Sequence, residues 1–154
     1  MFRMLIATVT IIVFMAVSPI VRAESTDLIV KESAADFPTT VRRLQTEIEK
    51  RGAKIVATVD HAAAAKANGL ELRPTTVIIF GNPKLGTPLM ESRQTAGLDL
   101  PLRVLIWEDA SNGVRIGYWP LSHITDAHAI EGLQDVKDKM TAALDVIIDA
   151  AAAP

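Results

Sequence analysis

Apolar and polar positions in the first part of the chain repeat with two periods, one typical of strands and one of helices. Residues 28–30 are apolar in succession and predict a short strand. Apolar residues then recur every three or four positions from Phe37 to Ile48, which predicts a helix that Asp36 caps and Gly52 ends. Residues 54–59 alternate between polar and apolar side chains and predict a second strand.

The middle of the chain continues in the same manner. Asp60 precedes an alanine-rich run at 61–68, and this order predicts a short helix with Asp60 as its N-cap. Residues 75–80 are β-branched or apolar at every position, which is typical of an interior strand. Thr87 and Pro88 have the residue types of an N-cap and a first helical position, so we expect the next helix to begin there.

The last part of the chain predicts a hairpin followed by a long helix. Residues 102–107 and 114–119 read as strands, and the Asn-Gly within 109–113 favours a tight turn between them. Apolar residues step by three and four from Leu133 to Ile147 and predict the final helix. The alanine-rich tail at 150–154 is expected to fray.

Five strands with helices between them, one link being a tight hairpin, predict the fold class. Long crossover helices do not join every pair of strands, as a parallel sheet would require. We therefore predict an α+β fold, a largely antiparallel five-stranded sheet with helices packed on it.

The N-terminus has the order of regions found in secretory signals. A short basic start, Met1-Phe2-Arg3, precedes an apolar run at 4–17, and Val21-Arg22-Ala23 fits a cleavage site. We therefore predict a cleavable signal peptide at 1–23, a single domain at 24–154, and a periplasmic or secreted location. After cleavage no membrane contact is expected. An uncleaved N-terminal anchor remains the alternative.

Composition narrows the possible chemistry. The chain contains no cysteine, which excludes disulfides, thiol catalysis and thiolate metal sites. Loss of Arg3 and Arg22 with the signal leaves 14 basic and 18 acidic residues, a net charge of −4, so we expect no nucleic-acid partner. The Walker, serine-hydrolase-elbow and His-Glu-x-x-His patterns are absent, and we expect no cofactor and no metal.

Several runs of residues closely resemble the domain-of-unknown-function family 302. They are the runs at 60–65, 69–76, 80–90, 99–102 and 107–109, of which the third, Phe-Gly-Asn-Pro-Lys-Leu-Gly-Thr-Pro-Leu-Met, is the most specific. The resemblance covers most of the predicted domain. It implies a small α+β fold that is often dimeric, found alone and exported or within larger proteins, and it implies no activity.

The loop Gly81–Thr87 is the first candidate for binding a ligand. It follows a predicted strand and opens a helix, so backbone N–H groups together with Lys84 would favour an anion. Asn82, Lys84, Gly86 and Thr87 are its candidate ligand-binding residues. The alternative is a tight connection in which glycines permit the turn and Thr87 caps the helix. Arg73, within the resembling run 69–76, is a fifth ligand-binding candidate.

Histidines and aromatic residues supply the remaining candidates. His61 is the candidate acid or base, although Asp60 beside it is better explained as a helix cap than as its catalytic partner. His123 and His128 lie five positions apart, which is not the spacing of a metal-binding pair on a helix. Trp107, Tyr118 and Trp119 are candidates for an apolar pocket, a dimer face or ordinary core.

Three functions remain open at this point. The leading hypothesis is an exported, non-enzymatic homodimer that binds a small molecule or an envelope partner. The second is an enzyme or anion-handling protein that uses His61 together with the Gly81–Thr87 loop. The third is a structural assembly module, which predicts a large apolar interface and no pocket.

Overall fold

The computed structural model describes residues 28–154, so the predicted signal peptide at 1–23 lies outside the described residues. The elements in chain order are β1 (Ile29–Ser33), α1 (Phe37–Lys50), β2 (Lys54–Asp60), α2 (His61–Ala67), β3 (Thr75–Gly81), α3 (Pro83–Ser92), the short 3₁₀ helix η1 (Gln94–Leu98), β4 (Leu102–Glu108), β5 (Val114–Tyr118), α4 (Leu121–Ala127) and α5 (Gln134–Ala152).

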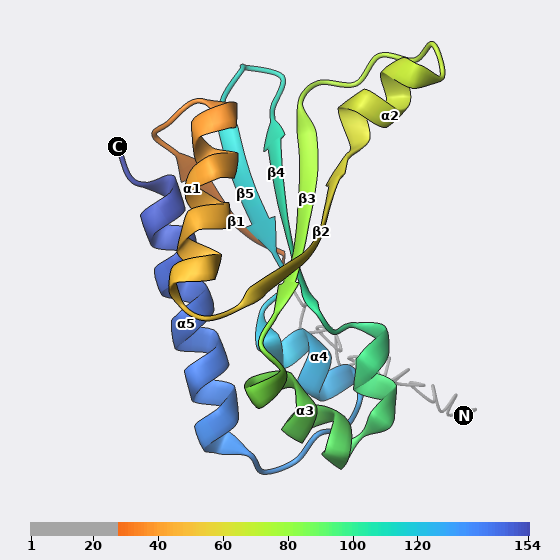
Figure 1. Cartoon of the computed structure of the whole chain (residues 1–154), viewed down its shortest axis with the longest axis vertical. Coiled ribbons are helices and arrows are strands. Elements are labelled where there is room, and N and C mark those ends of the chain that lie inside the picture. The colour runs from red at the N-terminus through yellow and green to blue at the C-terminus, as the bar shows by residue number, and fades with distance from the viewer. Residues whose placement is uncertain (1–27) are drawn as a thin grey trace, which may run out of the picture.

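The strands form one sheet in the order β1-β5-β4-β3-β2, and every neighbouring pair is antiparallel. Helices α1 and α5 lie side by side on one face of this sheet (Figure 1). The predicted α+β class and the antiparallel sheet are therefore confirmed. Strand β3 is an interior strand, as its apolar residues predicted, and β4 and β5 form the predicted hairpin.

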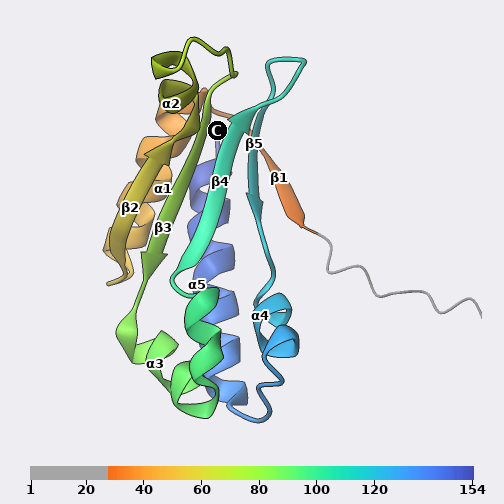
Figure 2. The same ribbon diagram turned by 90° about the vertical axis from the view of Figure 1, so that its right-hand side faces the viewer.

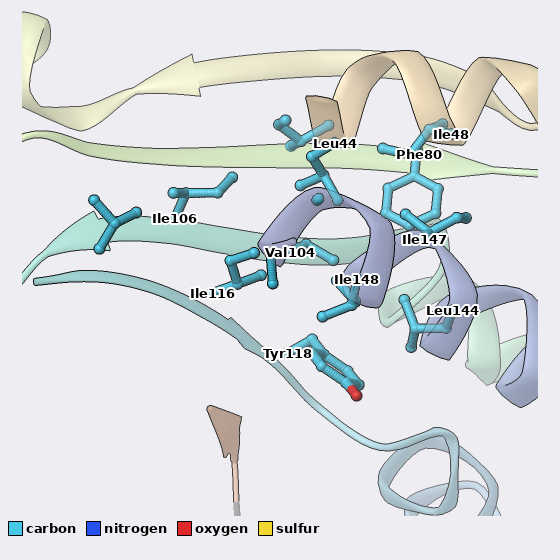
Figure 3. Close-up of a cluster of buried hydrophobic side chains, with 14 residues drawn as sticks. Leu44, Ile48, Phe80, Val104, Ile106, Ile116, Tyr118, Leu144, Ile147 and Ile148 are labelled. Atoms are coloured by element: carbon cyan, nitrogen blue, oxygen red, sulfur yellow. The ribbon is translucent and has the colours of Figure 1, made fainter. Parts of the chain in front are cut away.

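The main hydrophobic cluster lies between the sheet and helices α1 and α5. We call it the sheet cluster; its buried members are Leu44, Ile48, Ile78, Phe80, Val104, Ile106, Val114, Ile116, Tyr118, Leu144, Ile147, Ile148, Ala151 and Ala152. They occupy alternate positions of the three interior strands β3, β4 and β5 and one face of each of the two helices, which is the pattern expected of a sheet covered on one side. In Figure 3 the side chain of Phe80 from β3 points toward Ile147 of α5.

A second hydrophobic cluster lies beyond the lower end of the sheet, as oriented in Figure 1, where β2 begins and β3 ends. We call it the end cluster; its buried members are Leu89, Ala96, Leu121, Ile124, Ile130 and Met140. They come from α3, η1, α4, the segment after α4 and the first half of α5. Figure 2 shows α3 and α4 gathered beside the lower half of α5, below the strands.

Two predicted boundaries were wrong. Helix α3 begins at Pro83 with Asn82 as its N-cap, so Thr87 and Pro88 lie inside the helix. The C-terminal alanines do not fray, because α5 continues to Ala152 and the carbonyl of Ala152 accepts a hydrogen bond from the N–H of Ala34 at 3.0 Å. Alanine has no long side chain to signal burial, yet small residues pack closely against a neighbouring strand.

Within residues 28–154, no helix covers the face of the sheet opposite α1 and α5 (Figures 1 and 2). On this face the indole of Trp107 lies over Gly117, where an added Cβ would meet the ring at 2.8 Å. Val30, which pairs with Gly117, is 48% exposed, and Val59 of β2 is 38% exposed. No helix within residues 28–154 is both long enough and apolar enough to cross a membrane.

The contact between Trp107 and Gly117 gives a first prediction. Gly117→Ala should lower the free energy of unfolding by about 1–3 kcal/mol, because the new methyl group overlaps the indole ring. Gly86→Ala is the control, since its Cβ would lie at an ordinary 3.7 Å from Leu100 and alanine favours helix. Urea unfolding measures both. In a Trp107→Ala background the cost of Gly117→Ala should largely disappear, and a cost that persists there would contradict the assignment.

Candidate functional site

A cavity of about 450 Å³ opens between the lower end of the sheet, α3 and α5. We call it the seam cavity. It is lined by Arg51, Ala53, Lys54, Val56, Phe80, Gly81, Asn82, Pro83, Leu85, Gly86, Thr87, Met90, Leu100, Pro101, Leu102, Met140, Ala143, Leu144 and Ile147. Its volume falls within the range of small-molecule sites, and most of its lining is apolar, as in such sites.

The seam cavity lies where the two hydrophobic clusters meet. Phe80, Leu144 and Ile147 belong to the sheet cluster, whereas Met140 belongs to the end cluster. Leu102 packs against both clusters. This open groove has a largely apolar lining and the volume of a small-molecule site, so it is the strongest candidate for a binding site in the described residues.

Small residues in the lining leave this space open. Gly81 ends β3 and approaches Pro101 so closely that an added Cβ would lie 3.2 Å from the proline Cβ. Gly86 in α3 and Ala143 in α5 contribute no bulk to the lining. Larger side chains at Gly86 and Ala143 would extend from helices that border the cavity, so these positions control how much of it remains free.

Two basic residues stand in the lining at one end of α1. Arg51 is the C-cap of α1, and Lys54 is the first residue of β2. One guanidinium nitrogen of Arg51 lies 3.4 Å from the carboxylate of Glu47, which also accepts a hydrogen bond from Lys50 at 2.7 Å. That bond from Lys50 holds the pKa of Glu47 below its usual value, so Glu47 remains ionised down to lower pH.

The backbone donors at the start of α3 are already used, which argues against the predicted anion cradle. The side-chain oxygen of Asn82 accepts from the N–H of Lys84 at 3.0 Å. The carbonyl of Asn82 accepts from the N–H groups of Leu85 and Gly86, each at 2.9 Å. Pro83 has no N–H to offer. Helix N-termini bind anions through free N–H groups, and the first four positions of α3 leave none free.

The five predicted ligand-binding residues do not gather in one place. Asn82, Gly86 and Thr87 line the seam cavity, whereas Lys84 is exposed and outside its lining. Arg73 precedes β3 and donates a hydrogen bond to the carbonyl of Glu108 at 3.1 Å, so it lies at the upper end of the sheet. A single ligand at the lower end therefore cannot contact Arg73.

His61 also lies at the upper end of the sheet. It opens α2, a helix with no buried residue, directly after Asp60, whose side chain accepts the N–H of Ala63 at 2.8 Å. Lys54 pairs with Gly81, whereas Asp60 pairs with Thr76, so β2 runs its full length between the loop and His61. Six steps of strand separate them by roughly 20 Å. The proposed pairing of His61 with the Gly81–Thr87 loop is therefore wrong, and Asp60 serves as the helix cap.

A polar array around His128 was missed at the level of sequence. Its Nε2 lies 2.7 Å from a carboxylate oxygen of Asp99, and its Nδ1 lies 3.0 Å from the hydroxyl of Thr95. A histidine held between a carboxylate and a hydroxyl is the arrangement of an activated nucleophile. Here only a space of about 30 Å³ adjoins Asp99, room for one water molecule and no substrate. The array joins η1 to the end of α4 and is best explained as structural.

His123 contacts an aromatic ring, unlike His128, which lies between a carboxylate and a hydroxyl. The ring of His123 stacks on Trp119 with centroids 4.7 Å apart, and its buried Nδ1 has no hydrogen-bond partner among the described residues.

Within residues 28–154 no group of three or more histidine, aspartate or glutamate side chains is placed to hold a metal ion. Neither the seam cavity nor the His128 array has a signal in the sequence, because each joins residues from distant segments.

Comparison with known proteins agrees with the fold. Residues 29–151 match the family described as Domain of unknown function DUF302. The crystal structure of an uncharacterized conserved DUF302 protein from Bacillus stearothermophilus superposes with a TM-score of 0.73. That match covers 80% of this chain and 97% of the other, at 14% sequence identity, so it bears on fold alone. The resemblance inferred from the sequence runs is confirmed.

Curated relatives are longer proteins. The chain is 39% identical over 112 residues to "Fluoride-specific ion channel FluC 1" of Brucella suis biovar 1 (strain 1330). It is equally similar to the protein of that name from Brucella abortus biovar 1 (strain 9-941). The match covers 73% of this chain but only 44% and 42% of those relatives, so the chain spans less than half of their length.

The hydrogen bonds of Asn82 give a second prediction. Asn82→Ala should lower the free energy of unfolding by about 1 kcal/mol, because the N–H of Lys84 loses its acceptor, whereas Asn82→Asp keeps the cap. Phosphate and sulfate should raise the melting temperature of the wild type and of Lys84→Gln by the same amount, because these salts stabilise folded proteins in general and the first turn of α3 has no free donor for them. Thermal unfolding with and without these anions measures both effects. Stabilisation by either anion that Lys84→Gln removes would contradict this reading.

Proposed function

This chain belongs to the DUF302 family, and from that premise we propose that it is a non-enzymatic binding domain that takes up a small apolar molecule in the seam cavity. The observation that carries the proposal is the cavity itself, about 450 Å³ between two well-packed clusters. The space is open to solvent on one side and most of its lining is apolar, so an apolar ligand would be stabilised by removing that lining from water.

Location is part of the proposal. We propose that the protein acts in the periplasm or outside the cell, with residues 1–23 as its signal peptide. The support is the basic start, apolar run and cleavage-site order of the N-terminal residues. A cysteine-free domain that relies on its core for stability is compatible with that compartment.

The other two hypotheses have less support. The enzymatic one needed His61 beside the Gly81–Thr87 loop, and those residues lie at opposite ends of β2. The assembly module predicted no pocket, and the seam cavity is one. Fluoride conduction, the function in the names of the Brucella relatives, is not part of the proposal, because the chain spans less than half of their length.

A homodimer is the second element of the proposal. The open face of the sheet carries exposed Val30 and Val59 around the half-buried indole of Trp107. Arg115, which pairs with Trp107, forms ion pairs with Glu32 and Asp109 on this face, so the face is mixed in character. Its exposed valines and indole would supply the apolar part of a self-association surface, and a two-fold axis would bring the same patch of two copies together. The seam cavity opens at the lower end of the sheet, between α3 and α5, and would stay accessible in such a dimer.

The cavity predicts binding of a neutral apolar probe. The full-length protein should bind the dye N-phenylnaphthylamine with a rise in fluorescence. Ala143→Leu, which adds bulk to the lining, should weaken binding about tenfold or more, since a leucine side chain removes the space the ring would fill. Ala142→Leu is the matched control, because Ala142 is its exposed neighbour outside the lining. Equal binding of the dye by the two variants would contradict the proposal.

The dimer predicts a change in mass with one substitution on the open face. Val30→Glu should convert a dimer to a monomer, because it places a charge where an apolar contact is proposed. Val146→Glu, at a valine of α5 that is 47% exposed, is the control and should stay dimeric. Light scattering after gel filtration reads the mass directly. A wild-type protein that is monomeric at every concentration tested would refute the dimer and leave the cavity untouched.

A further inference from the structure

The charged side chains that line the seam cavity all have the same sign. Arg51 and Lys54 are the charged members of its lining, and no aspartate or glutamate belongs to it. The whole chain is acidic, with a formal net charge of −2, whereas both charged residues of the cavity lining are basic. Both basic residues are exposed, so their attraction for an anionic ligand would be moderate and would weaken with added salt.

Nearby carboxylates do not cancel this charge. Glu47 lies 3.4 Å from Arg51 and 2.7 Å from Lys50, so one carboxylate serves two cations. Within the described part of the chain, Lys54 forms no ion pair. The entrance formed by the end of α1 and the start of β2 is therefore net positive.

The opposite wall of the cavity is apolar. Met140, Leu144 and Ile147 of α5 are each no more than 6% exposed, and Phe80 of β3 is 3% exposed. These side chains form an inner wall without charge, while the two basic residues stand on α1 and β2 near solvent. A ligand that matches both regions has an apolar body and one anionic end.

We propose that the seam cavity binds a single-chain amphipathic anion, with a medium-length fatty acid as its simplest form. This inference rests on the proposed function and adds the ligand class. The apolar chain would lie along α5, and the carboxylate would pair with Lys54 and Arg51, whose donors suit an anionic head group. A volume near the lower end of known ligand sites favours a single chain of medium length over a lipid with two chains.

Three ten-carbon ligands that differ only in their head group test the inference. Isothermal titration of the full-length protein should give tightest binding for decanoate, about tenfold tighter than decanol, because the carboxylate gains charge-assisted hydrogen bonds. Decylammonium should bind most weakly. The preference for decanoate over decanol should shrink in high salt, which screens the pairing of charges.

The dependence of affinity on the length of the fatty acid tests whether its chain contacts the apolar wall. From hexanoate to octanoate to decanoate, affinity should rise about fourfold per methylene until the cavity is full. Micelle formation is avoided by working below the critical concentration of each ligand. A series without such a rise would show that the chain does not enter the cavity, and would overturn the inference.

Charge reversal identifies the head-group site. Lys54→Glu should remove the preference for decanoate and raise the affinity for decylammonium, while binding of decanol stays the same. Lys66→Glu is the matched control, because Lys66 is an exposed lysine of α2 at the upper end of the sheet. Thermal unfolding verifies that both variants are folded.

The outcomes separate the two levels of the proposal. If decanol binds as tightly as decanoate and Lys54→Glu changes neither, the anionic ligand class is wrong while an apolar binding function stands. If decanoate, decanol and the neutral dye all fail to bind the wild type, the proposed function fails together with it.

Discussion

The structure depends on α5, whose apolar stripe serves two hydrophobic clusters. Leu144, Ile147 and Ile148 pack into the sheet cluster, whereas Met140 packs into the end cluster. Helix α1, with 14 residues, is shorter than α5, with 19, and ends where β2 begins. Below that point α5 faces α3 instead of α1, its antiparallel neighbour above (Figure 1). One straight helix cannot match the surfaces of both neighbours closely, and the unfilled space between them is the seam cavity.

The same arrangement explains part of the charge at the cavity. The C-terminus of a helix carries a partial negative charge, so basic residues are favoured there whether or not a ligand binds. This accounts for Lys50 and Arg51 at the end of α1. It does not account for Lys54, which stands in a strand and has no ion-pair partner among the described residues. Lys54 is therefore the residue whose substitution tests the proposed ligand most directly, because the helix terminus does not explain its charge.

Much of the fold could be predicted from local patterns, because strands and amphipathic helices bury residues at fixed intervals. The predictions failed where two valid local signals competed. Asn82-Pro83 and Thr87-Pro88 both have the residue types of a helix start, and the chain uses the earlier one. Pro88 then lies within the helix without an N–H to donate, and Leu89 beside it is fully buried. At the earlier start, Asn82 accepts the N–H of Lys84 through its side chain and the N–H groups of Leu85 and Gly86 through its carbonyl, a set of bonds that the residue types alone do not reveal.

The candidate site was predicted less well than the fold, and the sheet itself shows why. In an antiparallel pair, the residue after one strand and the residue after the next lie at opposite ends. His61 follows β2 and the Gly81–Thr87 loop follows β3, so an antiparallel sheet already excluded their meeting. The loop was predicted to bind an anion from its place between a strand and a helix and from Lys84, but the number of free N–H groups decides whether a helix start can hold an anion. Asn82, Gly86 and Thr87 still border the cavity, but as parts of a wall that Leu144 and Ile147 complete from the far end of the chain.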